Sequence, residues 1–170
     1  MSALEIVAAL NTVEQDHQLV LDKVRALKDA VGCLAGPPDP DLRPVLDRLR
    51  EFNAFFATQF AVHLEEEETT LFPLLERDGR EGARLASRLR QEHDELRRRR
   101  AEFEDCLELA ADLEGSVPRA VLLDLLAYGW DFWEVLDSHA HAETRAFHER
   151  LNRALQGDAG PGARSPVAGC

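Results

Sequence analysis

Histidine and glutamate residues recur in this chain at one fixed offset. Two triplets of the same composition lie 76 residues apart, each a lone histidine followed 46 residues later by a His-x-x-x-Glu pair. They are His17, His63 and Glu67 in the first half, and His93, His139 and Glu143 in the second. An α-helix turns once per 3.6 residues, so a His and a Glu four positions apart project from the same face. The repeat therefore predicts helices that carry four imidazoles and two carboxylates.

Apolar residues follow helical spacing along almost the whole chain, and no stretch sustains a period of two. Turn-forming segments rich in Gly and Pro separate four apolar stripes, at residues 36–40, 78–82 and 115–118. Four helices of about 25 to 35 residues joined by short turns predict an all-α fold, an up-down-up-down antiparallel four-helix bundle. The later stripes are Leu49, Phe52, Phe56, Phe60, His63, Glu67, Leu71 and Leu74; Leu85, Leu89, His93, Leu96, Phe103, Leu107 and Ala110; and Leu122, Leu126, Gly129, Trp133, Leu136, His139, Glu143, Phe147 and Leu151.

The domain organisation is expected to be simple. A chain of 170 residues is long enough for one sizeable core but hardly for two, so residues 1–156 are assigned to a single bundle. Residues 157–170 are rich in Gly, Pro and Ala without a periodic pattern, and are expected to form a disordered C-terminal tail. Pro73 is expected to kink the second helix or end it early.

Charge and cysteine usage exclude several classes of function. A net charge of −12 disfavours binding to nucleic acid or to an anionic membrane surface. No apolar run reaches the roughly 18 residues of a membrane span, and the first residues lack the pattern of a secretory signal. The cysteines, Cys33, Cys106 and Cys170, are scattered and are interpreted as reduced thiols. A cytoplasmic location is expected.

All six residues of the two triplets fall on the apolar, core-facing stripes. Burying an unpaired carboxylate costs several kcal/mol, and two that face each other would cost more. Metal ions would supply the missing positive charge, each bound by two imidazole nitrogens, with the two glutamates bridging. Imidazole and carboxylate suit iron, manganese or zinc, and the spacing does not choose among these metals.

Two other interpretations of these residues fit the sequence less well. A single buried histidine is more often an ordinary polar residue of the core, but a shared offset among six residues argues against that explanation. A ferritin-like centre requires Glu-x-x-His on two helices, and Glu14 with His17 is the one match in this chain. The hypothesis of a two-metal site built from both triplets is therefore preferred.

Other polar and aromatic residues are assigned to solvent or to the core. The polar residues expected on solvated faces are His141, His148, Glu65, Glu66 and Glu68, although one of the glutamates could orient a ligand from behind. The basic run at 97–100 is explained by pairing within its own helix. The aromatic residues upstream of the second and fourth ligand clusters are expected in the core and, secondarily, as the lining of a pocket for a small neutral molecule. They are Phe52, Phe55, Phe56, Phe60, Trp130 and Trp133.

Over residues 4–155 the sequence resembles the hemerythrin-like family, also called HHE cation-binding domains. The most specific segments are HLEEEETTLFP at 63–73, EHDEL at 92–96, and the pair His139 and Glu143. The resemblance implies a cofactor of two iron ions, Fe2+ or Fe3+, joined by an oxo or hydroxo bridge. It assigns His17 and His63 to one iron, His93 and His139 to the other, and Glu67 and Glu143 to both.

The chain departs from the oxygen-carrying members of that family at three places. Arg97 stands where the carriers have a fifth histidine, and Glu143 lies four residues after His139 where the carriers have an aspartate after five. The resemblance therefore implies one iron with a more open coordination position. Phe147 and His148 replace a Phe-Pro ending, which is expected to alter the end of the helix and not the metal site.

The function implied is a di-iron protein that binds or reacts with a small oxidant, either O2, NO or peroxide, with an electron donor as a further candidate partner. The set is similar to that of bacterial di-iron proteins linked to iron-centre repair, nitric oxide and peroxide. Two alternatives remain open. One is an iron or oxygen sensing module, or an iron-centre repair module, that acts through a partner, and the other is an interaction bundle without metal. Whether the chain is an enzyme is left open.

Overall fold

The computed structural model describes residues 3–36, 41–77, 79–113 and 117–157, without the side chains of residues 3–18, 147 and 150–157. Nearly all of the described residues are helical, and they contain no strand. The all-α fold expected from the sequence is thereby confirmed. None of the helices described is long and apolar enough to cross a membrane.

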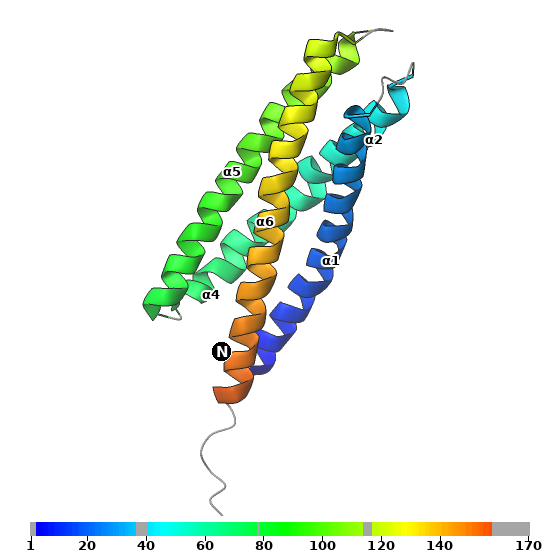
Figure 1. The fold of residues 1–170 in the computed structure, drawn as a ribbon. Helices are drawn as coiled ribbons and strands as arrows, with labels where there is room; N and C mark the ends of the chain where they lie inside the picture. The colour runs from blue at the N-terminus through cyan, green and yellow to red at the C-terminus, as the bar shows by residue number, and fades with distance from the viewer. Residues whose placement is uncertain (1–2, 37–40, 78, 114–116, 158–170) are drawn as a thin grey trace, which may run out of the picture.

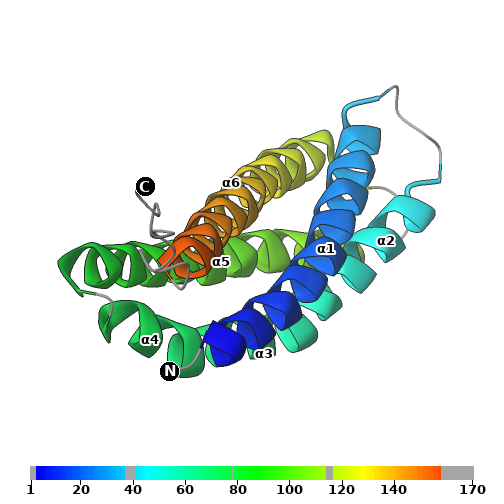
Figure 2. The same ribbon diagram turned by 90° about the horizontal axis from the view of Figure 1, so that it is seen from below.

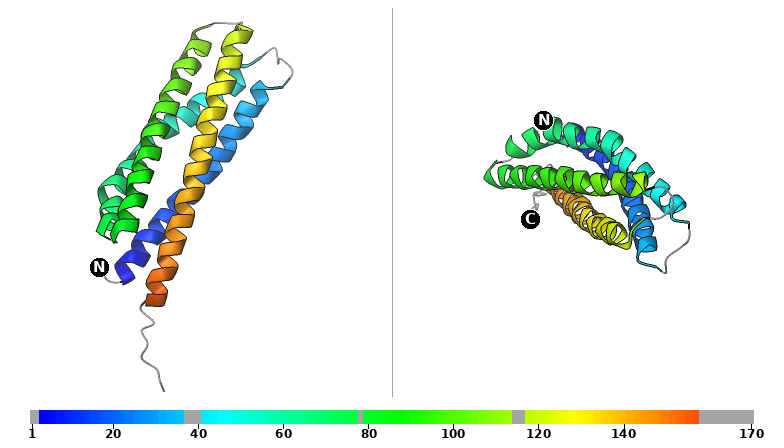
Figure 3. Two further views of the ribbon diagram at one scale, coloured as in Figure 1. Left: turned by 60° about the vertical axis from the view of Figure 1, so that its left-hand side comes forward. Right: turned by 90° about the horizontal axis from the view of Figure 1, so that it is seen from above.

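Four helical segments make up the described chain. They are α1 (Ala3–Leu34); a continuous second segment made of α2 (Arg43–Phe55), η1 (Phe56–Phe60), α3 (Ala61–Glu66), η2 (Glu67–Leu71) and α4 (Phe72–Arg77); α5 (Gly79–Asp112); and α6 (Arg119–Gly157). Figure 1 shows α6 lying between α1 and α5, and α6 contacts both helices. Seen from above, α5 lies between the curved second segment and α6 (Figure 3). This arrangement brings the second half of the chain against the first.

Two π-helical turns, η1 and η2, interrupt the second segment. A π turn adds a residue to one turn of the helix, and such turns are common at functional sites and at bends. Figure 2 shows the segment as a curved ribbon from α2 to α4. The added residues also explain why neighbours are buried together at each turn, Phe55 with Phe56 and Leu71 with Phe72. For the same reason Leu75 is buried, whereas the expected stripe residue Leu74 is only half-buried.

Of the two outcomes expected for Pro73, a kink or an early end of the second helix, the early end is not observed. Pro73 is the second residue of α4, and the helix continues to Arg77, so the proline does not end it early. Its ring would clash with a carbonyl in a regular helix, and the wider π turn just before it relieves that crowding. The turn expected at residues 78–82 is also shorter, because α5 already begins at Gly79. Gly79 has φ of 77°, a left-handed conformation that glycine adopts without a steric penalty.

The main core is aliphatic and aromatic and draws on all four segments. In α6 the buried apolar residues are Leu125, Phe132, Leu136 and Ala140. Leu126 and Trp133, expected on the core stripe, are only partly buried and pack at its edge. Apolar residues occupy both faces of α6 around Gly129, and contact with α1 and α5 buries the face that carries Leu125 and Phe132. The expected tail begins at the last residue of α6, and residues 158–170 lie outside the described part of the chain, so that expectation stays a prediction.

Candidate metal centre

A cluster of potential metal ligands lies between the second segment, α5 and α6. One ligand atom from each of four residues lies within 4.8 Å of the others, and all four side chains are buried. The four residues are Glu67, His93, His139 and Glu143. Glu67 is the first residue of η2, His93 lies on α5, and the other two lie one turn apart on α6.

His63 joins this cluster through Glu67. Its Nε2 lies 3.0 Å from Glu67 Oε1, and the two side chains are one turn apart on the same segment. The other carboxylate oxygen, Oε2, lies 3.4 Å from His93 Nε2 on α5. On α6, His139 Nε2 lies 3.2 Å from Glu143 Oε2. Glu67 therefore faces imidazoles of two different helical segments, one with each oxygen.

The imidazoles of His93 and His139 are held from behind by carboxylates. His93 Nδ1 donates to Glu68 Oε1 at 2.7 Å, and His139 Nδ1 donates to Glu92 Oε2 at 3.0 Å. A carboxylate accepts hydrogen bonds, so it fixes the proton on Nδ1 and leaves the Nε2 lone pair of a neutral ring directed into the cluster. Pairing of this kind orients histidine ligands in metal proteins and raises their basicity.

Arginines on α5 hold the two outer carboxylates in turn. Arg97 Nη2 donates to Glu68 Oε1 at 2.8 Å, and Arg88 Nε lies 3.5 Å from Glu92 Oε1. Burial alone would raise the pKa of Glu68, but its hydrogen bonds with His93 and Arg97 outweigh burial and lower that pKa. Glu68 thus stays a charged acceptor near neutral pH. Arg97 therefore acts on the outer carboxylate.

The electrostatics of the cluster favour a bound cation. Burial alone would lower the pKa of His139, but interactions with Glu143 and Glu92 outweigh it and raise the pKa to about 9. Without a metal, therefore, a proton supplies part of the positive charge that the buried acids require. Nε2 of His93 lies 3.4 Å from Glu67 Oε2 and Nε2 of His139 lies 3.2 Å from Glu143 Oε2, so both atoms face the buried carboxylates. Imidazole nitrogens and carboxylate oxygens suit iron, manganese or zinc, so the residues present fit a metal centre.

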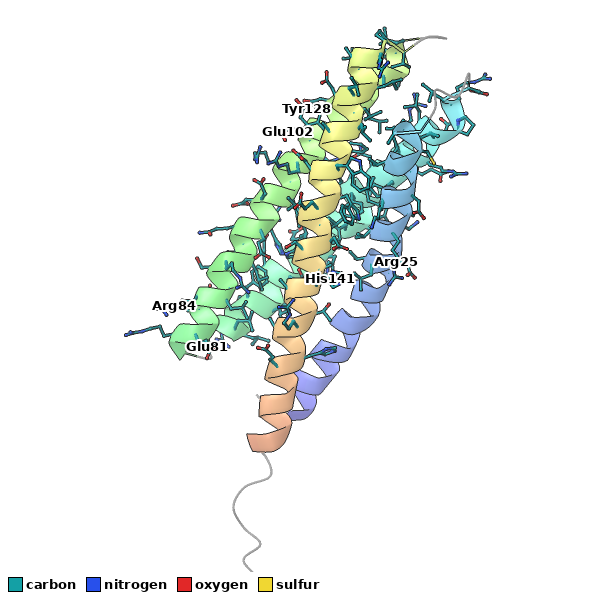
Figure 4. The ribbon with its side chains drawn as sticks, in the orientation of Figure 1. Arg25, Glu81, Arg84, Glu102, Tyr128 and His141 are labelled. Carbon is teal, nitrogen blue, oxygen red and sulfur yellow. The ribbon has the colours of Figure 1, made fainter. Side chains whose placement is uncertain are left out.

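The structure brings together five of the six residues predicted from the sequence. The sixth, His17, lies on α1, and its side chain is outside the described part of the structure. His141 and His148 are exposed, as expected from their place off the stripe. Figure 4 labels His141 on α6, where its Nδ1 donates to the backbone carbonyl of Asp137 at 2.7 Å. In the same figure, Arg84 of α5 extends away from the bundle.

The fold identifies two residues that support the ligands. Glu92 is one of the acidic residues on the helix of the basic run at 97–100, which the sequence predicts to pair within that helix, but its carboxylate reaches across to His139 on α6. For Glu68 the sequence offered the choice of a solvated residue or one that orients a ligand, and the contact with His93 favours the second. The signal available in the sequence was the position of each glutamate directly beside a predicted ligand, Glu67 or His93.

Comparison with protein families gives one match that covers most of the chain. The family described as the hemerythrin HHE cation binding domain matches residues 8–151. Neither the comparison with curated proteins nor that with solved structures returned a significant match. The matched region contains the whole buried cluster.

Proposed function

The chain belongs to the hemerythrin HHE cation-binding family, and from this premise we propose that it is a non-haem di-iron protein that binds or reacts with a small oxidant. The family and the buried Glu and His cluster both indicate a site for metal cations. The finer statements, that the metal is iron, that two ions are bound and that the ligand is O2, NO or peroxide, are part of the proposal. The up-down-up-down order of the four helices and the assignment of residues 1–156 to one bundle are also part of the proposal.

One observation carries the proposal, the position of Glu67 between two imidazoles. Its two oxygens lie 3.0 and 3.4 Å from the Nε2 atoms of His63 and His93. A carboxylate so placed is suited to bridge two metal ions, one on each oxygen. Glu143, buried beside His139, is suited to be the second bridge. We assign the six ligands as His17, His63, Glu67, His93, His139 and Glu143.

The metal pair, when bound, would supply redox chemistry and an open position for an external ligand. The chain's own contribution is to orient and to exclude water. Glu68 and Glu92 fix the rings of His93 and His139, and the buried residues around the cluster keep bulk solvent away. Four imidazoles and two carboxylates would occupy fewer coordination positions than two six-coordinate metal ions have. The remaining positions support binding of a small molecule. Turnover would in addition require an external electron donor.

Metal content and optical spectra test the proposal. Protein loaded with ferrous iron without oxygen and then desalted should retain two equivalents of iron per chain. His63→Ala and His139→Ala should lose most of that iron, and His141→Ala, which changes an exposed histidine, should keep it. Mixing the reduced protein with O2, NO or peroxide in a stopped-flow instrument should change its spectrum with at least one of the three. A protein that retains no iron, or responds to none of them, is not what we propose.

A sensing role is the second candidate, and the buried acids favour it. Because a cation stabilises the cluster, metal occupancy is linked to helix stability, and a partner protein could recognise the change. Circular dichroism with and without iron tests this idea. Identical helicity and thermal stability in the two states would exclude it.

A further inference from the structure

One carboxylate oxygen beside the cluster accepts hydrogen bonds from two different side chains. Oε1 of Glu68 lies 2.7 Å from His93 Nδ1 and 2.8 Å from Arg97 Nη2. Both distances are typical of a nitrogen that donates to an ionised carboxylate. The ring proton of His93 and the guanidinium of Arg97 therefore compete for the electron density of the same oxygen.

The fold fixes Arg97 at this oxygen. Arg97 lies on α5, one turn after His93, and Glu68 lies on the neighbouring turn η2. The other terminal nitrogen, Nη1, donates to Asp94 Oδ1 at 3.3 Å, which anchors the far side of the guanidinium. The Arg97 side chain is 45% exposed, so the charge at this position can be changed with little effect on the packed core.

The ring of His93 is also held by contacts that do not involve this oxygen. It is fully buried, and the Phe72 ring packs against it with the ring centroids 5.1 Å apart. The His139 ring lies on it edge to face, with the centroids 4.9 Å apart. A change at Arg97 should therefore alter the strength of the hydrogen bond from His93 Nδ1 more than the position of the ring.

The second outer carboxylate, Glu92, provides a comparison within the same molecule. Its Oε2 accepts the hydrogen bond from His139 Nδ1, whereas Arg88 Nε lies 3.5 Å from the other oxygen, Oε1. That distance exceeds the usual length of an N–H···O bond, and the Arg88 side chain is 58% exposed. Arg88 thus withdraws little electron density from the oxygen that holds His139. The two histidines are backed by carboxylates of unequal strength.

From these contacts we propose that Arg97 is a positioning residue that acts through Glu68 to weaken His93 as a metal donor, and that it thereby favours ferrous over ferric iron at this position. A carboxylate that accepts the Nδ1 proton makes a histidine a more basic ligand, and a guanidinium on the same oxygen reduces that effect. A less basic ligand favours Fe2+, because the ion of higher charge gains more from a strong donor. This inference rests on the proposed function, which assigns an iron ion to His93.

Redox titration of the iron-loaded, full-length protein tests the proposal. Arg97→Gln should strengthen the binding of Fe3+ relative to Fe2+ about 10-fold, which lowers the midpoint potential by about 59 mV for one electron. Arg97→Lys, which keeps a cation, should stay near wild type, and Glu68→Gln should raise the potential. Arg88→Gln removes the same charge beside the other outer carboxylate and should leave the potential unchanged. An Arg97→Gln potential that is unchanged or raised, or a fall of equal size in Arg88→Gln, overturns the proposal.

Nuclear magnetic resonance of the metal-free protein gives a second readout that does not depend on iron. A stronger hydrogen bond moves the resonance of the donated proton downfield. Arg97→Gln should therefore move the Nδ1 proton of His93 downfield and leave that of His139 in place. An unmoved His93 proton overturns the inference whether or not iron binds. A protein that retains no iron contradicts the proposed function instead, and the proton resonances still decide whether Arg97 acts on His93.

Discussion

At the scale of single residues, the candidate centre depends on charged groups outside the ligand set. Glu92 accepts a hydrogen bond from His139 Nδ1, so we predict that Glu92→Ala lowers the affinity for ferrous iron by about 10- to 100-fold, the usual effect of losing such a partner. Competition with a coloured chelator under argon measures the change. Glu65→Ala, which removes an exposed carboxylate nearby, is the matched control and should bind like wild type. Equal affinities for all three proteins would show that Glu92 does not support the site.

Protonation of His139 leads to a second prediction at this scale. Its pKa is raised to about 9, whereas in the unfolded chain it is about 6.5. The protonated ring therefore stabilises the metal-free fold fully below about pH 6.5, and this contribution is lost as the pH rises through about 9. A metal requires the neutral ring, so binding should release a proton, and the affinity for Zn2+, a redox-inactive probe, should rise between pH 6.5 and 9. An affinity that is flat over this range, measured by competition titration, would contradict the assignment of His139 as a ligand.

The sequence identifies the inner residues of this centre better than the outer ones. His63, Glu67, His139 and Glu143 can be found because a spacing of four residues within a helix fixes which side chains share a face. Contacts between helices have no such local rule. Glu92 lies near Arg88 on its own helix and also reaches His139 on α6, and this second contact depends on the separation and rotation of two helices, which the chain's periodicity leaves undetermined.

At the scale of helices, one glycine permits a close approach of α6 to α1. A Cβ added at Gly129 would lie 2.8 Å from a methyl group of Val31, which is fully buried and stiff. We predict that Gly129→Ala lowers the free energy of unfolding by about 1–3 kcal/mol, the usual cost of overpacking. Gly32→Ala, also within a helix but with nothing within 4 Å, should raise it by up to about 1 kcal/mol. Urea unfolding measures the free energy of unfolding of both variants. A loss of stability in neither variant, or in both, would contradict the close contact of Gly129 with Val31.

The π turns mark the limit of prediction at this scale. The apolar stripe through Phe52, Phe56 and Phe60 predicts a helix correctly, because its spacing suits a regular turn. A π turn adds one residue without interrupting that stripe, so the apolar pattern does not reveal it. Its effect appears downstream, where Leu75 takes the core position expected for Leu74. The turn η2 shapes the candidate centre, because it begins at Glu67 and contains Glu68, which accepts a hydrogen bond from His93.

At the scale of the whole molecule, the two halves of the sequence repeat meet at one buried place. Glu67 and His63 come from the first half, and His93, His139 and Glu143 from the second. Their helices also share the main apolar core, so the site and the core are organised together. The repeat alone predicted this convergence, because helices of similar length and spacing bring equivalent depths together. It did not predict which apolar face of α6 would be buried above the site.

Metal binding should consequently stabilise the entire bundle. A ligand that binds only the folded state at 100 times its Kd adds about 2.7 kcal/mol, which for a chain of this size raises the Tm by roughly 5–10 °C. We predict such a rise for the wild type with ferrous iron under argon, followed by circular dichroism. His93→Ala removes a fully buried imidazole of the cluster and should abolish most of the rise, whereas His141→Ala should retain it. Both variants lose one histidine. An equal rise in Tm for the two would therefore mean that iron stabilises the fold by binding outside the buried cluster.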